Sequence, residues 1–341
     1  MKVLVTGGTG FVGGHIAAAL VKAGHDVRLL VRRPAQVATT MAPLDVHIDD
    51  VVVGDALDAA SVAVALDGCD AVVHAAAIFS LNAGRAAEVR DTNARAAEIV
   101  LTAAVERGLD PVVHISSTVA LTRPDGSGPD LPLGTLDWPY AQSKIASEIV
   151  ARRLQGEGAP VVTVYPGSVY GPHDPYRGEQ SERLRWVLSG RFPLWPAGRL
   201  HSVDVRTVSD TVLAALERGQ GPKRYVVPGV AVDGETYYGT AEAVTGRRLP
   251  RLIAPPGVVV PVARAMSVLQ RPLPDRWHYP ADPEGAALNA CATVFDDTPA
   301  RAGLGVEPVP FEQSIRDTVV WLAESGRLKP KYAGRALAGP V

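Results

Sequence analysis

Lys2-Val3-Leu4-Val5-Thr6-Gly7-Gly8-Thr9-Gly10-Phe11-Val12-Gly13, near the N-terminus, joins an apolar run to three evenly spaced glycines. The run reads as a buried strand, and His15–Ala23, which Gly24 closes, reads as a helix. Between them, the glycines at positions 7, 10 and 13 provide a tight turn, close backbone approach to a diphosphate, and contact of helix with strand. This strand, turn and helix predict nucleotide binding at the end of the first strand.

The same alternation continues along the chain. Further strands are predicted at 26–31, 51–53, 71–75, 111–116 and 160–165, and helices at 58–66, 91–107 and 140–154. Each strand is nearly all apolar, as parallel strands buried on both faces are. Repeated strand–helix units predict an α/β fold with a Rossmann-type doubly wound parallel sheet.

The pattern weakens after the sixth strand. A helix at 181–189, a strand at 200–205 and a helix at 209–218 are predicted, and the proline-rich stretch Val230–Leu328 reads as short helices joined by rigid loops. We expect an NADP-binding domain at 1–170, with 198–228 returning to it. A smaller, mostly helical C-terminal substrate lobe is expected from 171–197 and 229–330, and 331–341 should be a frayed tail.

Composition excludes several classes of function. The 341 residues carry a formal net charge of −2, which gives no basic footprint for nucleic acid. Cys69 and Cys291 lack a CxxC spacing and the eight histidines lack a metal spacing, so neither a disulfide framework nor a metal site is expected. No signal peptide and no apolar run long enough to span a bilayer are recognised. These features predict a cytoplasmic protein.

The end of the second strand bears on cofactor choice. An NAD site places a carboxylate there to bind the ribose 2′-hydroxyl, whereas this chain has Val31 followed by Arg32 and Arg33. Two cations favour a 2′-phosphate, so NADP(H) is expected rather than NAD(H). The alternative is that the arginines only solvate a loop. After the fourth strand, the small residues of His74-Ala75-Ala76-Ala77 would let a flat ligand lie against the strand ends.

Tyr140 and Lys144 are spaced i,i+4 on a predicted helix that Asp137 would open and Pro139 would begin. A free tyrosine titrates near 10. A nearby ammonium, assisted by the helix N-terminus and an oxidised nicotinamide, would lower the pKa of Tyr140 and make it an acid/base. The alternative is an ordinary pair on a helix surface. Ser116-Ser117-Thr118 places hydroxyls at the end of the fifth strand, where ligands of such sheets bind.

Six motifs occur in one order: Thr6-Gly7-Gly8-Thr9-Gly10-Phe11-Val12-Gly13, Gly54-Asp55, His74-Ala75-Ala76, Ser116-Ser117, Tyr140-xxx-Lys144 and Pro166-Gly167-Ser168-Val169-Tyr170-Gly171-Pro172. Together they resemble the extended short-chain dehydrogenase/reductases, also called the NAD-dependent epimerase/dehydratase family, over roughly residues 2 to 215. Arg32 and the pattern Val203-Asp204-Val205-Arg206 are similar to the dihydroflavonol-reductase branch.

The resemblance implies roles for individual residues. Tyr140 would exchange a proton with the substrate oxygen, Lys144 would hold the nicotinamide ribose, and Ser117, with Ser116 and Thr118 as alternatives, would bind the reacting oxygen. Asn93 resembles the family's helix-embedded asparagine. The implied cofactor-binding residues are Gly7, Thr9, Gly10, Phe11, Val12, Gly13, Arg32, Arg33, Asp55, Ala56, Ala75, Ala76, Ala77, Tyr140, Lys144, Pro166, Gly167 and Val169. A homodimer is also implied.

Departures from the family pattern favour one activity. Thr118-Val119 stands where dehydratases carry Asp-Glu, and Ser168 stands where epimerases commonly carry asparagine. The first expectation is therefore an NADP(H)-dependent oxidoreductase that interconverts a carbonyl and a secondary alcohol. A nucleotide-sugar epimerase and a non-catalytic NADP-binding regulator are the alternatives.

The segment after the sixth strand suggests the kind of substrate. Its aromatic residues Tyr176, Trp186, Phe192 and Trp195 favour a largely apolar small molecule. These residues could instead be ordinary core. The arginines Arg183, Arg185, Arg191 and Arg199 could clamp a sugar diphosphate and are the main objection.

Overall fold

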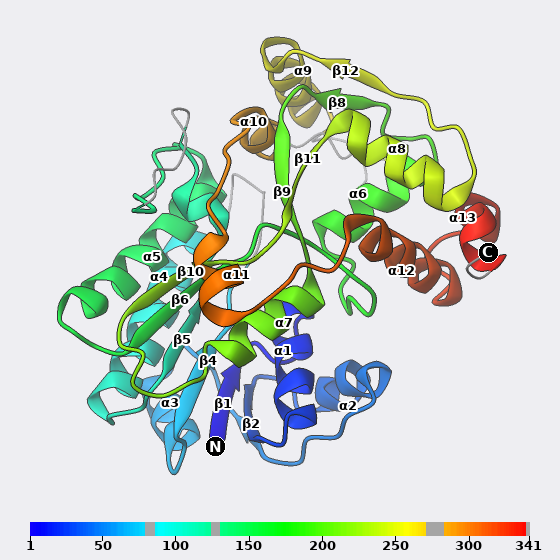
Figure 1. The fold of residues 1–341 in the computed structure, drawn as a ribbon. Helices are drawn as coiled ribbons and strands as arrows, with labels where there is room; N and C mark the ends of the chain where they lie inside the picture. The colour runs from blue at the N-terminus through cyan, green and yellow to red at the C-terminus, as the bar shows by residue number, and fades with distance from the viewer. Residues whose placement is uncertain (79–85, 124–129, 271–282, 339–341) are drawn as a thin grey trace.

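The computed structural model describes residues 1–78, 86–123, 130–270 and 283–338 (Figure 1). A seven-stranded sheet has the order β10-β6-β5-β4-β1-β2-β3, and every neighbouring pair is parallel. Its strands are β1 (Lys2–Thr6), β2 (Asp26–Val31), β3 (Val51–Val53), β4 (Ala71–His74), β5 (Val112–Ile115), β6 (Val161–Tyr165) and β10 (Lys223–Val226). The predicted doubly wound parallel sheet is confirmed.

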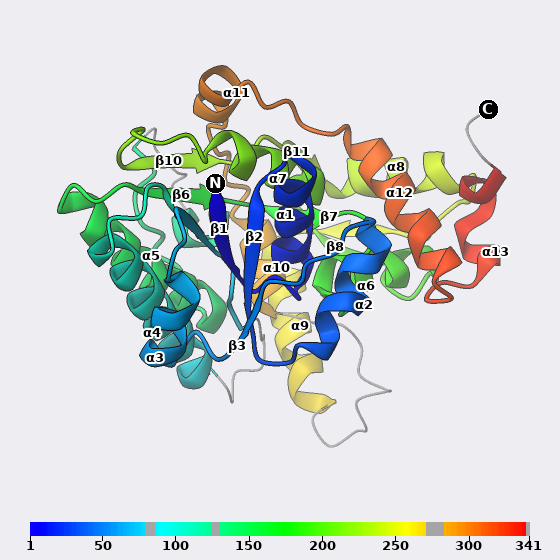
Figure 2. The same cartoon turned by 90° about the horizontal axis from the view of Figure 1, so that it is seen from below.

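Helices cover both faces of this sheet (Figure 2). One face carries α1 (Phe11–Lys22), α2 (Ala35–Met41) and α7 (Val205–Ala214), and the other carries α3 (Ala59–Leu66), α4 (Ala86–Glu106) and α5 (Pro139–Gly156). Alternate strand residues supply the two layers, because successive side chains of a strand point to opposite faces. Val3 and Val5 thus belong to the first hydrophobic cluster, and Leu4 belongs to the cluster on the opposite face.

Several helices begin earlier than the sequence predicted, and α7 and α1 show why. α7 begins at Val205 rather than Ser209, because the Asp204 side chain accepts a hydrogen bond from the Arg206 backbone N–H and caps the helix there. α1 begins at Phe11 rather than His15, directly after the glycine turn. In both cases a stable N-terminus lies ahead of the apolar periodicity from which the helix was recognised.

The remaining elements lie outside the seven-stranded sheet, and most of them form a second packed region around the second hydrophobic cluster. They are β7 (Ser168–Tyr170), α6 (Glu179–Leu188), β8 (Leu194–Pro196), β9 (Arg199–Asp204), β11 (Val230–Asp233), α8 (Gly234–Thr245), β12 (Leu252–Ala254), α9 (Pro256–Leu269), α10 (Pro283–Ala290), α11 (Thr298–Leu304), α12 (Phe311–Glu324) and α13 (Pro330–Ala333). β11, β9 and β7 form one small sheet, and β12 pairs with β8. The interpretation of Val230–Leu328 as short helices and loops is therefore wrong in part, since the described residues of this range also form two strands and its helices reach 14 residues.

The predicted frayed tail is also wrong as far as residue 338. α13 and the 3₁₀ turn Gly334–Ala338 pack into the second hydrophobic cluster, where Ala333 and Ala336 are buried. The Arg335 side chain donates hydrogen bonds to the Ala243 carbonyl oxygen. Short alanine side chains gave no periodic signal that could predict this packing. The proposed domain boundaries stay a prediction.

Across the described ranges, no helix is long and apolar enough to cross a bilayer.

Candidate active site

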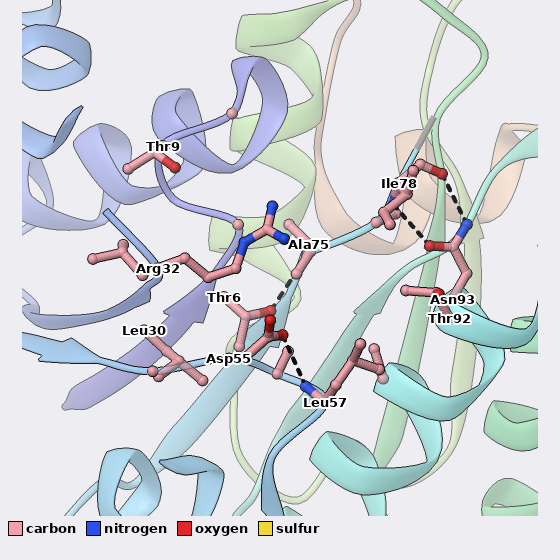
Figure 3. Close-up of a pocket in the computed structure, with 18 of the residues that line it drawn as sticks. Thr6, Thr9, Leu30, Arg32, Asp55, Leu57, Ala75, Ile78, Thr92 and Asn93 are labelled. Carbon is pink, nitrogen blue, oxygen red and sulfur yellow. Dashed lines mark hydrogen bonds between the residues drawn. The ribbon is translucent and has the colours of Figure 1, made fainter. Parts of the chain in front are cut away.

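A cavity of about 540 Å³ opens at the carboxyl ends of β1, β2 and β4 (Figure 3). This size is within the range of small-molecule and cofactor sites, and the position is the edge at which doubly wound sheets bind ligands. The predicted cofactor residues that line it are Gly7, Thr9, Gly10, Arg32, Arg33, Asp55, Ala56, Ala75, Ala76 and Ala77.

The glycine turn forms part of the cavity wall and has no room for side chains. Gly7 has a φ of +75°, and a Cβ on it would lie 2.7 Å from the Ala75 carbonyl carbon and the Ala76 nitrogen. A Cβ on Gly13 would lie 2.3 Å from the Gly7 carbonyl oxygen. Gly10 is the N-cap of α1 and provides no side-chain cap. The first N–H groups of α1 are therefore arranged as an anion site.

A buried hydrogen-bond chain fixes the end of β4 against β1. The Ala76 N–H donates to Thr6 Oγ1 at 3.3 Å, and Thr6 Oγ1 lies 2.8 Å from His74 Nδ1. Burial, with a smaller contribution from the charge of Lys144, lowers the pKa of His74 to about 3. His74 is therefore a neutral structural residue that is hydrogen-bonded through Nδ1 to the Thr6 hydroxyl.

Charged side chains stand at the rim where β2 ends. Arg32 and Arg33 are exposed, and Figure 3 shows the Arg32 side chain extending into the cavity. No carboxylate within the described residues forms an ion pair with either arginine. Asp55 faces the same cavity, and its Oδ1 accepts the Leu57 backbone N–H at 3.1 Å. This rim combines two cationic side chains with one carboxylate.

A loop from the second region also reaches this rim, which the sequence did not predict. The Tyr176 hydroxyl donates a hydrogen bond of 3.1 Å to Gln36 Oε1, and both residues line the cavity. Asp174 organises the loop by accepting hydrogen bonds from the Tyr176 and Gly178 N–H groups. Arg327 donates to the Asp174 carbonyl oxygen.

The predicted acid/base group is assembled at the start of α5. The Lys144 ammonium lies 6.0 Å from the centre of the Tyr140 ring. The Ser117 hydroxyl is hydrogen-bonded to the Tyr140 phenol, and its oxygen also accepts the Val119 N–H at 3.2 Å. Ser116 Oγ, by contrast, is buried and has no hydrogen-bond partner among the described residues. The geometry therefore favours Ser117 over Ser116 as the hydroxyl beside Tyr140.

The expected lowering of the Tyr140 pKa is not found in the protein alone. Burial of the phenol raises its pKa well above the usual value, the charges of Glu179 and Glu284 raise it further, and the Ser117 hydrogen bond opposes them. Burial also lowers the pKa of Lys144 from 10.5 to about 8. Desolvation outweighs the attraction between ammonium and phenolate, so Tyr140 is protonated at neutral pH.

The helix that carries Tyr140 has an unforeseen cap. Trp138, and not Asp137, is the N-cap residue of α5, and it provides no side-chain hydrogen bond. Instead, the Glu284 carboxylate accepts the backbone N–H of Tyr140 at 3.2 Å and that of Ala141 at 2.9 Å. No sequence signal could have revealed this contact, because Glu284 lies 144 residues from Tyr140.

Asn93 lies at the cavity, but its amide is engaged by other groups. It accepts the Ile78 N–H at 2.8 Å and donates to the Ile78 carbonyl oxygen at 2.9 Å and to Ser143 Oγ at 2.7 Å (Figure 3). These bonds tie the segment after β4 to the helix that carries Tyr140 and Lys144. The geometry gives Asn93 a positioning role in this site.

A smaller cavity of about 130 Å³ is lined in part by Tyr140. Its lining combines polar and apolar side chains: Ser117, Thr118, Val119, Thr122, Tyr140, Ser168, Val169, Glu179, Gln180, Arg183, Arg199, Leu200, His201, Leu288, Thr293 and Phe295, together with Gly167 and Gly285. Arg183 forms an ion pair with Glu179. A small molecule held here would contact the Tyr140 phenol.

The aromatic run does not line this smaller cavity, so the argument for an apolar substrate based on it is wrong. Trp195 is 1% exposed and belongs to the second hydrophobic cluster, against which Phe192 packs. Trp186 lies beneath the guanidinium groups of Arg185 and Arg191. A lobe with its own core must bury aromatic side chains, and that requirement determined where these residues lie.

The other predicted cofactor residues do not line the larger cavity. Gly167 and Val169 line the smaller one, and a Cβ on Gly167 would lie 2.0 Å from the His201 carbonyl oxygen. The Pro166 carbonyl oxygen accepts the Thr118 N–H at 2.9 Å. Phe11 and Val12 begin α1, where Val12 packs against the first hydrophobic cluster.

Residues 3–227 match the sequence model of the NAD dependent epimerase/dehydratase family. The chain is 28% identical over 335 residues to the "Sterol demethylase protein B" of Methylococcus capsulatus, covering 96% of this chain and 100% of that protein. It is 27% identical over 337 residues to a "Putative dihydroflavonol 4-reductase" of Synechocystis sp., covering 95% of each. The crystal structure of gox2253 superposes with a TM-score of 0.80 at 28% identity, covering 96% of this chain and 99% of that one.

These similarities agree with the strand order and with the position of the larger cavity. The matched residues make up more than half of the chain and include the glycine turn, Tyr140 and Lys144. The chain belongs to the NAD-dependent epimerase/dehydratase family, and it is an NAD(P)-dependent enzyme of the extended short-chain dehydrogenase/reductase type.

Proposed function

We propose that this protein is an NADP(H)-dependent oxidoreductase that interconverts a carbonyl and a secondary alcohol on a largely apolar small molecule. The observation that carries the proposal is the place of Tyr140. Its phenol is hydrogen-bonded to Ser117 and faces a small cavity beside the larger, cofactor-sized one. The larger cavity would hold the cofactor and the smaller one the substrate.

The chain's own residues account for the proton in this reaction. A bound nicotinamide supplies or accepts the hydride. In the reductive direction, Tyr140 donates its phenolic proton to the substrate oxygen, and Ser117 holds that oxygen by a hydrogen bond. At neutral pH the phenol is protonated, which is the form that donates in this direction. The ammonium of Lys144 stabilises the phenolate that remains until solvent returns a proton.

The preference for NADP(H) rests on Arg32 and Arg33, which line the cavity with no described carboxylate paired to them. A charge-assisted hydrogen bond contributes about 1.5 to 3 kcal/mol, so NADPH should bind at least about tenfold more tightly than NADH. Arg32→Ala should reduce that ratio, and high salt should reduce it in the wild-type protein. Fluorescence titration with both cofactors measures the ratio.

Arg107→Ala is the matched control, because it removes the same charge from the far end of α4. It should leave the ratio unchanged. Equal affinities of the wild-type protein for NADPH and NADH would contradict the cofactor assignment.

The substrate proposal rests on the lining of the smaller cavity. Arg183 is already paired with Glu179, which weakens it as a clamp for a diphosphate. Leu200, Leu288 and Phe295 contribute apolar surface. The names of two relatives, a sterol demethylase protein and a putative dihydroflavonol reductase, support a ring-bearing organic substrate.

The second candidate function, nucleotide-sugar epimerisation, is favoured by the presence of both Arg183 and Arg199 in the same cavity. We expect a panel of apolar ketones to be reduced with consumption of NADPH, and UDP- and dTDP-sugars not to bind in calorimetric titrations with NADP⁺ present. Micromolar binding of any of these nucleotide sugars would overturn the apolar substrate and support the epimerase.

A further inference from the structure

The helix that carries Tyr140 depends on a distant residue for its N-terminal cap. Three other helices of the described chain have a side-chain cap from their own N-cap residue, which is Asp58 for α3, Asp204 for α7 and Asp233 for α8. The local N-cap of α5 is Trp138, whose side chain cannot accept a hydrogen bond, and Pro139 follows it. Without another partner, the first N–H groups of α5 would lack an acceptor inside the protein.

Glu284 on α10 supplies that acceptor. Its Oε2 accepts the Tyr140 N–H at 3.2 Å and its Oε1 accepts the Ala141 N–H at 2.9 Å. Glu284 is 3% exposed, so the contact is made away from water, where it is strongest. A carboxylate at a helix N-terminus also interacts favourably with the helix dipole.

The same helix forms part of the wall of the smaller cavity. Gly285 and Leu288, which follow Glu284 on α10, line the cavity beside Tyr140. One carboxylate therefore joins the backbone of Tyr140 to the element that encloses the proposed substrate site. A shift of α10 would move both the wall and the residue that carries the phenol.

We propose that Glu284 is a positioning residue for the reaction, which fixes Tyr140 by capping α5 and thereby couples its orientation to the closure of the substrate cavity by α10. The inference rests on the proposed role of Tyr140 as acid/base. By this inference α10, which lies outside the motifs of the nucleotide-binding region, contributes to catalysis.

The charge of Glu284 has a separate effect on the phenol. The charged groups around Tyr140 are Glu179 on α6, Glu284 on α10 and Lys144 on α5, and Arg183 and Arg199 line the same cavity. Glu179 and Glu284 both raise the pKa of Tyr140. Removing the Glu284 charge should therefore move the Tyr140 limb of the pH profile for alcohol oxidation to lower pH, because oxidation requires the phenolate.

The experiment compares Glu284→Gln and Glu284→Ala with Asp58→Ala, which removes the cap of α3, a helix that does not line the smaller cavity. Misplacing a reacting group by about 1 Å costs about 100-fold in rate, so Glu284→Ala should lower kcat by about 10- to 100-fold. Glu284→Gln keeps one acceptor oxygen, so it should retain more activity while its pH limb moves down. NADPH affinity should stay as in wild type, since Glu284 does not line the larger cavity.

Asp58→Ala should lower stability with no change in kcat or in the pH profile. A wild-type kcat and an unmoved pH limb in Glu284→Gln would overturn the inference, even if Glu284→Ala failed to fold. Tyr140→Phe, measured in parallel, tests the proposed function itself. If Tyr140→Phe keeps full activity, the function assignment fails. A Glu284→Gln protein with wild-type kcat and an unmoved pH limb, beside an inactive Tyr140→Phe, refutes the positioning role alone.

Discussion

Tyr140→Phe should lower turnover by about 100-fold or more, the loss expected when a general acid is removed, while NADPH binding stays close to that of wild type. The substitution deletes only the hydroxyl. The ring keeps its place on α5, and the larger cavity is lined by residues of β1, β2, β4 and their loops rather than by Tyr140. Steady-state kinetics and a fluorescence titration of NADPH test the two halves of this expectation.

Tyr165→Phe is a suitable control, because it deletes a phenol that donates a hydrogen bond to Glu148 within a buried cluster. That variant should lose stability and keep its catalytic rate. Turnover by Tyr140→Phe within a few-fold of wild type would contradict the acid/base assignment.

Lys144→Met should make the cofactor-free protein more stable while abolishing most of its activity. The pKa of Lys144 is lowered from 10.5 to about 8 by burial alone, so the folded protein bears a cost for keeping the amine charged. One pKa unit corresponds to about 1.36 kcal/mol, which sets an upper bound of about 3 kcal/mol on the gain. Partial exposure reduces the expected gain to about 1 to 2 kcal/mol. Turnover should fall because the phenolate loses its neighbouring positive charge.

The stability that Lys144→Met gains over wild type should decrease as the pH rises. Below pH 8, Lys144 is protonated in both the folded and the unfolded protein, and the full free-energy cost of burying its charge is present. Between about 8 and 10.5 the unfolded chain binds more protons, so the stability contributed by this site rises with pH and the cost disappears near 10.5. Urea unfolding of both proteins at several pH values measures the difference, with the exposed Lys223→Met as control. A Lys144→Met protein less stable than wild type at pH 7 would contradict the expectation.

The sequence predicted the nucleotide-binding region well because its signals are local. The strand Lys2–Thr6 and the glycines that follow it lie within a dozen residues, and steric limits at Gly7 and Gly13 permit few alternatives. The pair Tyr140 and Lys144 is likewise defined by the spacing of one helical turn. Each of these features could be interpreted without knowing what packs against it.

The missing parts depend on contacts between distant residues. The cap that Glu284 provides and the Tyr176–Gln36 hydrogen bond join residues 144 and 140 positions apart, and neither has a local pattern. The aromatic run predicted an apolar binding site for a related reason. An aromatic residue such as Trp195 gives the same sequence pattern whether it lies in a hydrophobic core or in a binding site. The pKa of Tyr140 was misjudged because the spacing revealed Lys144, whereas burial and Glu179 act through the fold.

The chain passes repeatedly between its hydrophobic clusters, and this limits the exchange of segments between this enzyme and its relatives. The second cluster is built from residues within 170–195, 232–249 and 315–336, and the intervening 203–227 contributes to the first cluster together with Ala300. No single cut separates the two. A chimaera that received the substrate region of a relative would need three transplanted segments that fit one another and the recipient sheet. Specificity in such a protein should therefore diverge by replacement of individual cavity residues rather than by recombination of modules.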